Sequence, residues 1–270
     1  MPQLMRTSNP ALGESAFRNQ PRAYARTIDG ERFGGGLPSE REASMTLNGT
    51  VNRTGILLVL AIASAGWTWL QFMQSRNPAD VMPWMLLGLF GGLIAAMVTI
   101  FKKEWSPVTA PAYALLEGLV LGGLSAVFEL RYPGIAIQAV GLTFGTLFVL
   151  LFIYRTGVIK VTDKFRLGVF AATGGVALFY LASMIFGMFG MHFNGTNGVF
   201  GSGLIGIGFS LIVVGIAALN LVLDFDFIEK GVQYGAPKYM EWYGAFGIMV
   251  TLVWLYMEML RLLSKIRDRN

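Results

Sequence analysis

Acidic side chains stand inside, or directly beside, long apolar runs of this sequence. "LVLDFDFIEKG" contains Asp224 and Asp226, "VWLYMEMLRLL" contains Glu258, and "YALLEGLVLGG" contains Glu117. A charge in the hydrocarbon of a bilayer costs at least about 2.5 kcal/mol, so an acid at that depth indicates a functional site. Two such carboxylates in contact would share a proton and titrate as a coupled pair. Once ionised, they would offer the hard oxygen ligands that calcium prefers.

Each acid also has a structural interpretation. Asp226 could lie in solvent at the end of a helix. Glu258 could form a salt bridge with Arg261, which is three residues further on and therefore on the same helix face. Glu117 could be a buried acid that is hydrogen-bonded to a neighbouring helix. We therefore keep all four acids as candidate functional residues, with Glu117 and Asp226 as possible members of an ion pathway. The choice of Asp224 and Glu258 as the pH-sensing, gating pair and as tentative calcium ligands is what the family resemblance given below implies.

The elements that position these acids are seven apolar stretches, which predict an all-α integral membrane protein. The chain has 270 residues, of which 54% are hydrophobic and 14% are charged, against roughly 25% charged in an average soluble protein. Each stretch approaches the roughly 20 residues with which a helix crosses a bilayer. We expect spans at 56–74, 82–101, 109–128, 134–154, 167–190, 201–223 and 242–263.

Residues 1–54 differ from the remainder of the chain. They hold seven arginines and five acids, with Gly, Pro and Ser and no apolar period. Such a segment cannot bury enough surface to offset the entropy of ordering. We expect a disordered basic tail at 1–54, followed by a transmembrane domain at 55–270.

Lysine and arginine counts in the short loops predict the orientation. With the tail in the cytoplasm, the inner loops hold eight Lys or Arg residues and the outer loops hold Arg76 and Arg131. The basic C-terminal sequence "RLLSKIRDRN" does not fit this orientation, because a seventh crossing would place its Lys and Arg residues outside the cytoplasm. Either it is a tolerated exception or the last segment does not fully cross. The net charge of +5 is then a topology signal, and we expect no nucleic-acid partner.

The position of the last turn decides whether Asp224 and Glu258 can meet. The sixth and seventh segments are joined by a short polar connection and should be antiparallel neighbours. A turn centred near residue 241 would bring the two acids to one depth. A turn at "GAPK", near residue 236, would offset them by some nine residues, or about 13 Å.

Pairs of glycines spaced by four should let neighbouring helices approach closely. These pairs are Gly118 with Gly122 and Gly141 with Gly145. The single histidine, His192, stands in a Gly/Asn loop, and the chain lacks a histidine cluster of the zinc-protease kind. We therefore expect neither an enzyme nor a required cofactor.

Several of these segments together resemble the Bax inhibitor-1 family, also called transmembrane Bax inhibitor motif proteins. The similar segments are "LNLVLDFDFIEKG", "VTLVWLYMEMLRLL", "KKEWSPVTAPAYALLEGLVLGGL" and "GLTFGTLFVLL". The likeness covers roughly residues 56–265 and points to a bacterial-type member. It implies six helices around a central seventh, and a pH-sensitive calcium leak channel in the bacterial inner membrane.

The resemblance also implies roles for individual residues. The family's paired acids fall on Asp224 and Glu258, and the basic residue that bonds to such a pair falls on Lys102 or Lys103. This chain departs from the family pattern at both places. Glu258 stands where the family has aspartate, and Lys102 or Lys103 stands where an arginine is expected, so the planar guanidinium with its fork of donors is lost. The partners would be the lipid bilayer and cations. A non-conducting membrane interaction protein and a proton-coupled transporter remain the alternatives.

Overall fold

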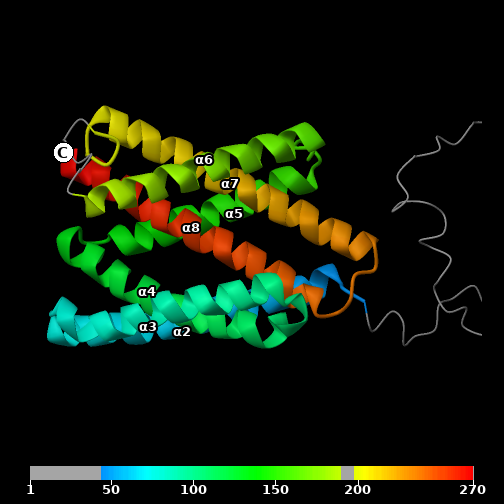
Figure 1. Cartoon of the computed structure of the whole chain (residues 1–270), viewed down its shortest axis with the longest axis horizontal. Coiled ribbons are helices and arrows are strands. Elements are labelled where there is room, and N and C mark those ends of the chain that lie inside the picture. Colours follow the sequence, from blue (N-terminus) through cyan, green and yellow to red (C-terminus); the bar gives the residue numbers. More distant parts are fainter. Residues whose placement is uncertain (1–43, 190–197, 270) are drawn as a thin grey trace, which may run out of the picture. The chain divides into compact units, whose positions relative to one another are not determined.

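The computed structural model describes residues 44–189 and 198–269, and nearly all of them are helical. Seven α-helices in this part of the chain are long and apolar enough to cross a membrane, as judged by length and composition. They alternate in direction (Figure 1). The elements are α2 (Leu47–Ser75), α3 (Pro78–Phe101), the short 3-10 helix η3 (Lys103–Trp105), α4 (Ser106–Arg131), α5 (Ile135–Arg155), α6 (Asp163–Met188), α7 (Leu204–Gln233) and α8 (Met240–Arg269).

The predicted spans fall within these helices, apart from one to three residues at one end of the spans predicted at 134–154, 167–190 and 201–223; residue 190 lies outside the described residues. Helix α2 begins at Leu47 because the side chain of Thr46 caps it, accepting a hydrogen bond from the amide of Gly49 at 3.0 Å. The helix therefore includes residues that the sequence assigned to a tail ending at residue 54. The tail prediction for residues 1–43, and the position of His192, lie outside the described residues.

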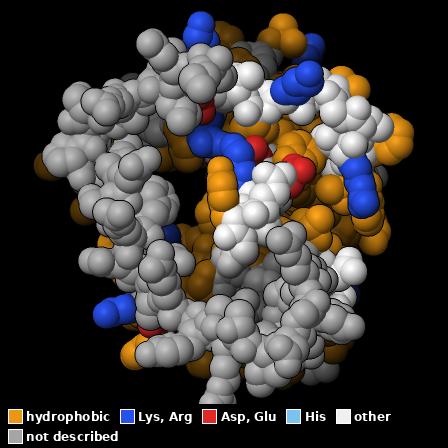
Figure 2. Space-filling model, turned by 90° about the vertical axis from the view of Figure 1, so that its right-hand side faces the viewer, with side chains coloured by type: hydrophobic (Ala, Val, Ile, Leu, Met, Phe, Trp, Pro, Cys, Tyr) orange, Lys and Arg blue, Asp and Glu red, His pale blue; other side chains and the backbone are white. Residues whose placement is uncertain are grey.

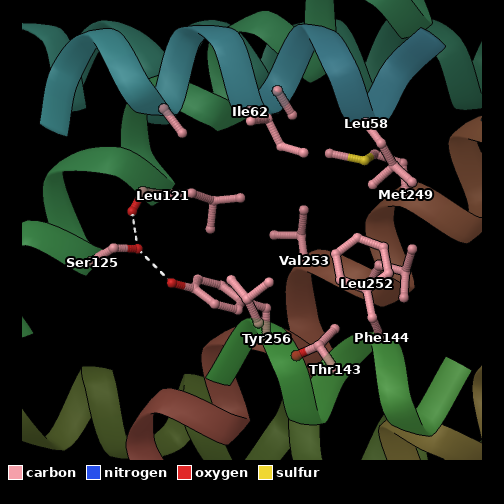
Figure 3. A pocket seen from close by; sticks show the side chains of 13 residues that line it. Leu58, Ile62, Leu121, Ser125, Thr143, Phe144, Met249, Leu252, Val253 and Tyr256 are labelled. Carbon is pink, nitrogen blue, oxygen red and sulfur yellow. Dashed lines mark hydrogen bonds between the residues drawn. The ribbon is translucent and has the colours of Figure 1, made fainter. Parts of the chain in front are cut away.

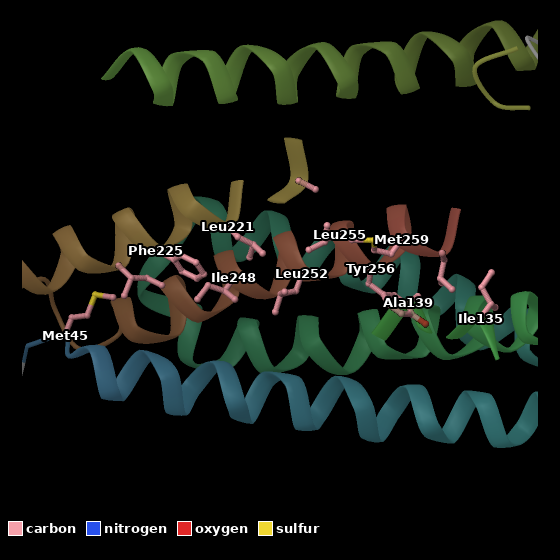
Figure 4. Packing of buried hydrophobic residues seen from close by; sticks show 13 residues of the cluster. Met45, Ile135, Ala139, Leu221, Phe225, Ile248, Leu252, Leu255, Tyr256 and Met259 are labelled. Atoms are coloured by element: carbon pink, nitrogen blue, oxygen red, sulfur yellow. The ribbon is translucent and has the colours of Figure 1, made fainter. Parts of the chain in front are cut away.

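Helix α8 is the central helix of the bundle. In its most apolar 18-residue stretch, 61% of the residues are buried within the protein, against 11–39% in the other six helices. It contacts α2, α4, α5 and α7, whereas α6 packs on α7. Its apolar side chains meet those of α7 and α5 in the largest buried cluster (Figure 4), which includes Ile135, Ala139, Leu221, Phe225, Ile248, Leu252, Leu255 and Met259. The all-helical prediction, with a helix bundle around the last span, is confirmed.

Two glycines on α4 allow α2 to approach its backbone. A Cβ atom placed on Gly118 would lie 2.0 Å from Ser64 Oγ, and one on Gly122 would lie 2.1 Å from the carbonyl oxygen of Ala65. Neither distance is sterically possible, so α2 and α4 pack this closely because both positions are glycine.

The second predicted glycine pair has no such role. Added Cβ atoms on Gly141 and Gly145 of α5 would meet nothing within 4 Å. The prediction of a close helix contact there is wrong, because both residues face outward from the bundle. Spacing by four defines a face of a helix but does not say what that face contacts.

Basic side chains gather at the end of the bundle where α7 ends and α8 begins. Figure 2 looks onto this end, where Lys and Arg side chains stand out with a few acids among them. Six exposed Lys or Arg residues lie on the connections at this end or in the first or last residues of the helices beside them: Lys102, Lys103, Arg155, Lys160, Lys164 and Lys238. We call this end, at which α2, α4, α6 and α8 all begin, the basic end.

Candidate functional site

Asp224 lies on α7 and faces α8. Its Oδ2 accepts a hydrogen bond of 2.6 Å from the hydroxyl of Thr251. Its Oδ1 lies next to Gly247, where an added Cβ atom would be 3.5 Å away. Within the described residues Asp224 forms no ion pair with Lys or Arg. The half-buried carboxylate therefore occupies a groove of α8 between Gly247 and Thr251, with a hydroxyl donor and no cation beside it.

Glu258 lies on α8 and is buried, with a relative exposure of 2%. Its Oε1 accepts hydrogen bonds from Arg261 at 2.7 Å and from the hydroxyl of Tyr180, on α6, at 3.1 Å. The same Arg261 nitrogen also donates to the Tyr180 hydroxyl at 2.7 Å. Glu258, Arg261 and Tyr180 thus join the C-terminal half of α8 to α6.

The structure does not bring Asp224 and Glu258 together. Helix α7 ends at Gln233 and α8 begins at Met240, so the turn is centred near "GAPK", as in the second alternative above. Asp224 is level with Thr251, which precedes Glu258 by seven residues, or about 10 Å along the helix. The two carboxylates occupy separate sites with separate partners. The expected proton-sharing pair, and a calcium site built from both of its oxygens, are absent from this arrangement.

The two predicted latch lysines also lie elsewhere. Lys102 caps the end of α3, and Lys103 places its ammonium 5.2 Å from the centre of the Tyr243 ring at the basic end. Both side chains are exposed. Neither forms an ion pair with an acid of the described chain. They were misplaced because the assignment followed the order of motifs along the chain, whereas the acids lie deeper in the bundle.

The remaining predicted acids differ from each other. Asp226 is 8% exposed, and its Oδ2 pairs with Arg166 at 2.6 Å and with Lys230 at 2.9 Å. Its charge is therefore balanced by two cations, and the interpretation as a solvated helix end is wrong. Glu117 is half-buried on α4 and faces α3, with Oε2 3.2 Å from where a Cβ of Gly92 would be. It forms no hydrogen bond with a described residue.

Sequence reasoning missed a buried cation on the same helix as Glu258. Lys265 is 5% exposed, and its ammonium donates to the carbonyl oxygens of Val199 and Gly206 at 3.0 Å and to Ser210 Oγ at 2.9 Å. The sequence placed Lys265 in a basic C-terminal tail. The signal that could have found it is the spacing of Arg261 and Lys265 from Glu258, which puts all three on one face of a helix.

A second missed residue is Glu241, in the first turn of α8. It is 1% exposed, and its Oε1 accepts hydrogen bonds from the amide and the hydroxyl of Thr46, at 3.0 and 2.8 Å. Lys238 pairs with the same oxygen at 3.2 Å. An added Cβ atom on Gly49 would lie 2.0 Å from Oε1. Glu241 therefore fastens the start of α2 to the start of the central helix.

The described part of the chain contains no group of three or more His, Cys, Asp or Glu residues that could hold a metal ion. Asp224 could offer a single carboxylate to a passing cation, whereas the carboxylate of Glu258 is already paired with Arg261. A single carboxylate suits transient contact with an ion better than a resident metal, which takes six to eight oxygen ligands in the case of calcium.

The fold and these buried charges define a class of protein. It is a helical membrane protein with seven candidate spans, and its central helix carries ionisable side chains that are buried inside the bundle. The chain belongs to the Bax inhibitor 1 like family, whose model matches residues 9–268. This confirms the family resemblance and extends it towards the N-terminus by almost fifty residues. Neither a curated protein nor a solved structure matches the chain.

Proposed function

We propose that this protein is a pH-sensitive leak pathway for cations, with calcium as the ion to test first. The observation that carries the proposal is the carboxylate of Asp224, which faces the central helix with a single hydroxyl donor and no cationic partner. Acids inside transmembrane segments are costly, and they commonly mark ion pathways or proton relays. Of the two neighbouring acids on α7, Asp226 pairs with Arg166 and Lys230, whereas Asp224 has no neutralising charge beside it. Glu229, further along α7, also forms no ion pair with a described residue, but it is exposed.

The proposed chemistry follows from the two protonation states of Asp224. The ionised carboxylate accepts the Thr251 hydroxyl through Oδ2 and leaves Oδ1 to attract a cation. Protonation removes the charge and the attraction with it. Cation flux is therefore expected to fall as the pH is lowered. Glu258 does not act as the second member of a pair here, because Arg261 already balances its charge.

Lys265 explains why such a pathway would be closed in this conformation. It places a positive charge on the half of α8 that leads away from the basic end, and its ammonium is fixed there by three oxygen acceptors without an acid partner among the described residues. A fixed positive charge repels a cation most strongly in a poorly hydrated interior. Opening would require this half of α8 to move, with the Glu258, Arg261 and Tyr180 contacts exchanged or released.

A non-conducting membrane protein is the second candidate. The observation that favours it is that the most deeply buried charged groups, Glu241, Glu258 and Lys265, all hold helices or loops together. In that case the acids would stabilise the bundle, and its exposed surface would bind a partner.

Calcium flux into proteoliposomes loaded with a calcium indicator tests the proposal. Vesicles with the wild-type protein should take up calcium faster than empty vesicles, with a rate that declines towards acidic pH. The variant Asp224→Asn should conduct less and lose most of this pH dependence. Glu258→Gln should change the flux level, because it weakens the Arg261 and Tyr180 contacts, but should keep the wild-type pH dependence. Saturable uptake that requires a counter-ion would indicate a transporter. Flux no greater than that of empty vesicles at every pH would reject the proposal.

A further inference from the structure

An apolar cavity of about 150 Å³ lies between α2, α4, α5 and α8 (Figure 3). Leu58 and Ile62 of α2 form one wall, and Leu252 and Val253 of the central helix form its floor. On the opposite side, Phe144 of α5 closes it. These residues lie near the middle of their helices, far from both ends of the bundle. The cavity is therefore at the depth at which the surrounding membrane consists of hydrocarbon.

The hydroxyls at the edge of the cavity are already satisfied. Ser125 donates to the carbonyl oxygen of Leu121, and Tyr256 OH lies 2.6 Å from Ser125 Oγ (Figure 3). Because Ser125 has one hydrogen, Tyr256 must be the donor of the second bond. Thr143 likewise donates to the carbonyl oxygen of Ala139, at 2.8 Å. The cavity therefore offers no free donor to a polar ligand.

Water is a poor occupant for this cavity. A buried water needs two to four polar partners, and an apolar cavity of about 150 Å³ stays dry and instead binds apolar molecules such as benzene or xenon. An unfilled void also forgoes the dispersion contacts of its lining. The chemistry of the lining thus selects a hydrocarbon.

The cavity opens sideways, between α2 and α5. Ile62 and Val140 line it from these two helices and are 62% and 37% exposed. In contrast, Leu252, Val253 and Tyr256 at its inner side are at most 9% exposed. A molecule in the membrane can therefore reach these three buried residues of the central helix through this opening.

We propose that this cavity binds the terminal hydrocarbon segment of a phospholipid acyl chain, which enters from the membrane between α2 and α5. The opening is apolar and lies at mid-span, where the neighbouring molecules in a bilayer are acyl chains. The bound segment contacts Leu252 and Val253, directly beside Thr251 of the Asp224 contact. The site is independent of the proposed cation pathway and stands on the cavity alone.

Photo-crosslinking in proteoliposomes tests this site. The probe is a phosphatidylcholine that carries a diazirine near the methyl end of one acyl chain, and labelled residues are mapped by mass spectrometry. We expect labelling of Leu252, Val253 and Tyr256, which are at most 9% exposed and line the cavity. A second probe with the diazirine next to the headgroup should not label these residues.

Two variants with matched controls make the result specific. Ile62→Trp should fill the opening and reduce labelling of α8 several-fold, while Val59→Trp, at a 65% exposed position of the same helix outside the cavity, should leave it unchanged. Val140→Trp should act like Ile62→Trp from the α5 side, and Ile137→Trp, at a 72% exposed position, should not. Absence of α8 labelling in the wild-type protein would overturn the proposal. Equal labelling in Ile62→Trp and Val59→Trp would do so too.

Discussion

The contact between Glu258 and Arg261 gives the sharpest test of how the buried acids are partnered. Replacing Arg261 by Met would leave the Glu258 carboxylate, which is 2% exposed, with Tyr180 as its hydrogen-bond donor. Removing one partner of a buried ion pair typically costs about 3–5 kcal/mol. Because the Arg261 side chain is 36% exposed, we expect a loss near the lower limit, about 3 kcal/mol in the free energy of unfolding.

Double-mutant cycles then separate this contact from the expected pairing with Asp224. The double variant Glu258→Gln with Arg261→Met removes both charges, so it should recover much of the loss and show a coupling energy of about 1–3 kcal/mol. Asp224→Asn and Glu258→Gln should instead add to within about 0.5 kcal/mol, as expected for separate sites.

The assay is reversible unfolding of the purified protein in mixed micelles, followed by circular dichroism. Arg269→Met, at the exposed end of α8, serves as the control for loss of an arginine charge. If Arg261→Met is no more destabilising than Arg269→Met, while Asp224 and Glu258 are strongly coupled, the assignment of partners given above is refuted and the proton-sharing pair is restored.

Three further tests, with four substitutions, address individual contacts of the fold by the same unfolding assay. Gly118→Ala should destabilise the protein because its Cβ atom would overlap α2. Gly145→Ala, whose Cβ atom would meet nothing, should stabilise the protein by up to about 1 kcal/mol. Equal effects of the two substitutions would contradict the close α2–α4 packing. Thr46→Val should lower the free energy of unfolding by about 1–2 kcal/mol, because it removes both the cap of α2 and a hydrogen-bond donor to Glu241. An unchanged midpoint of unfolding would show that this contact does not hold α2 to α8. Arg166→Met should lower the free energy of unfolding by about 1 kcal/mol or less, since Lys230 continues to balance the charge of Asp226. A loss as large as that of Arg261→Met would show that Lys230 cannot replace Arg166 as the partner of Asp226.

The seven spans could be predicted from the sequence because each requires a continuous apolar run of fixed length. The central position of the last helix came from the family resemblance, and its burial confirms it. The start of α2 was predicted too late, at residue 56, because its first turns are polar and are held by Thr46 and Glu241. A contact between residues that lie 195 positions apart leaves no trace in local periodicity.

The partners of the acids were harder to predict than their depth. Asp224 was correctly placed at the boundary with α8, but its neighbour there depends on the exact position of the turn before Met240. A shift of the turn by three or four residues changes the facing residue from Glu258 to Thr251, because the facing position moves by twice the shift. By contrast, the salt bridge of Glu258 with Arg261 follows from helix geometry and was available from their spacing.

The pH profile of calcium flux through Asp224→Asn proteoliposomes tests the proposed role of Asp224 most directly. The substitution keeps the size of the side chain and an oxygen acceptor for the Thr251 hydroxyl, so it removes the ionisable charge with little change in packing. We predict a flux that is lower than that of the wild-type protein at neutral pH and nearly constant as the pH falls. A wild-type flux with the wild-type decline at acidic pH would contradict the assignment of Asp224 as the pH-sensitive cation site.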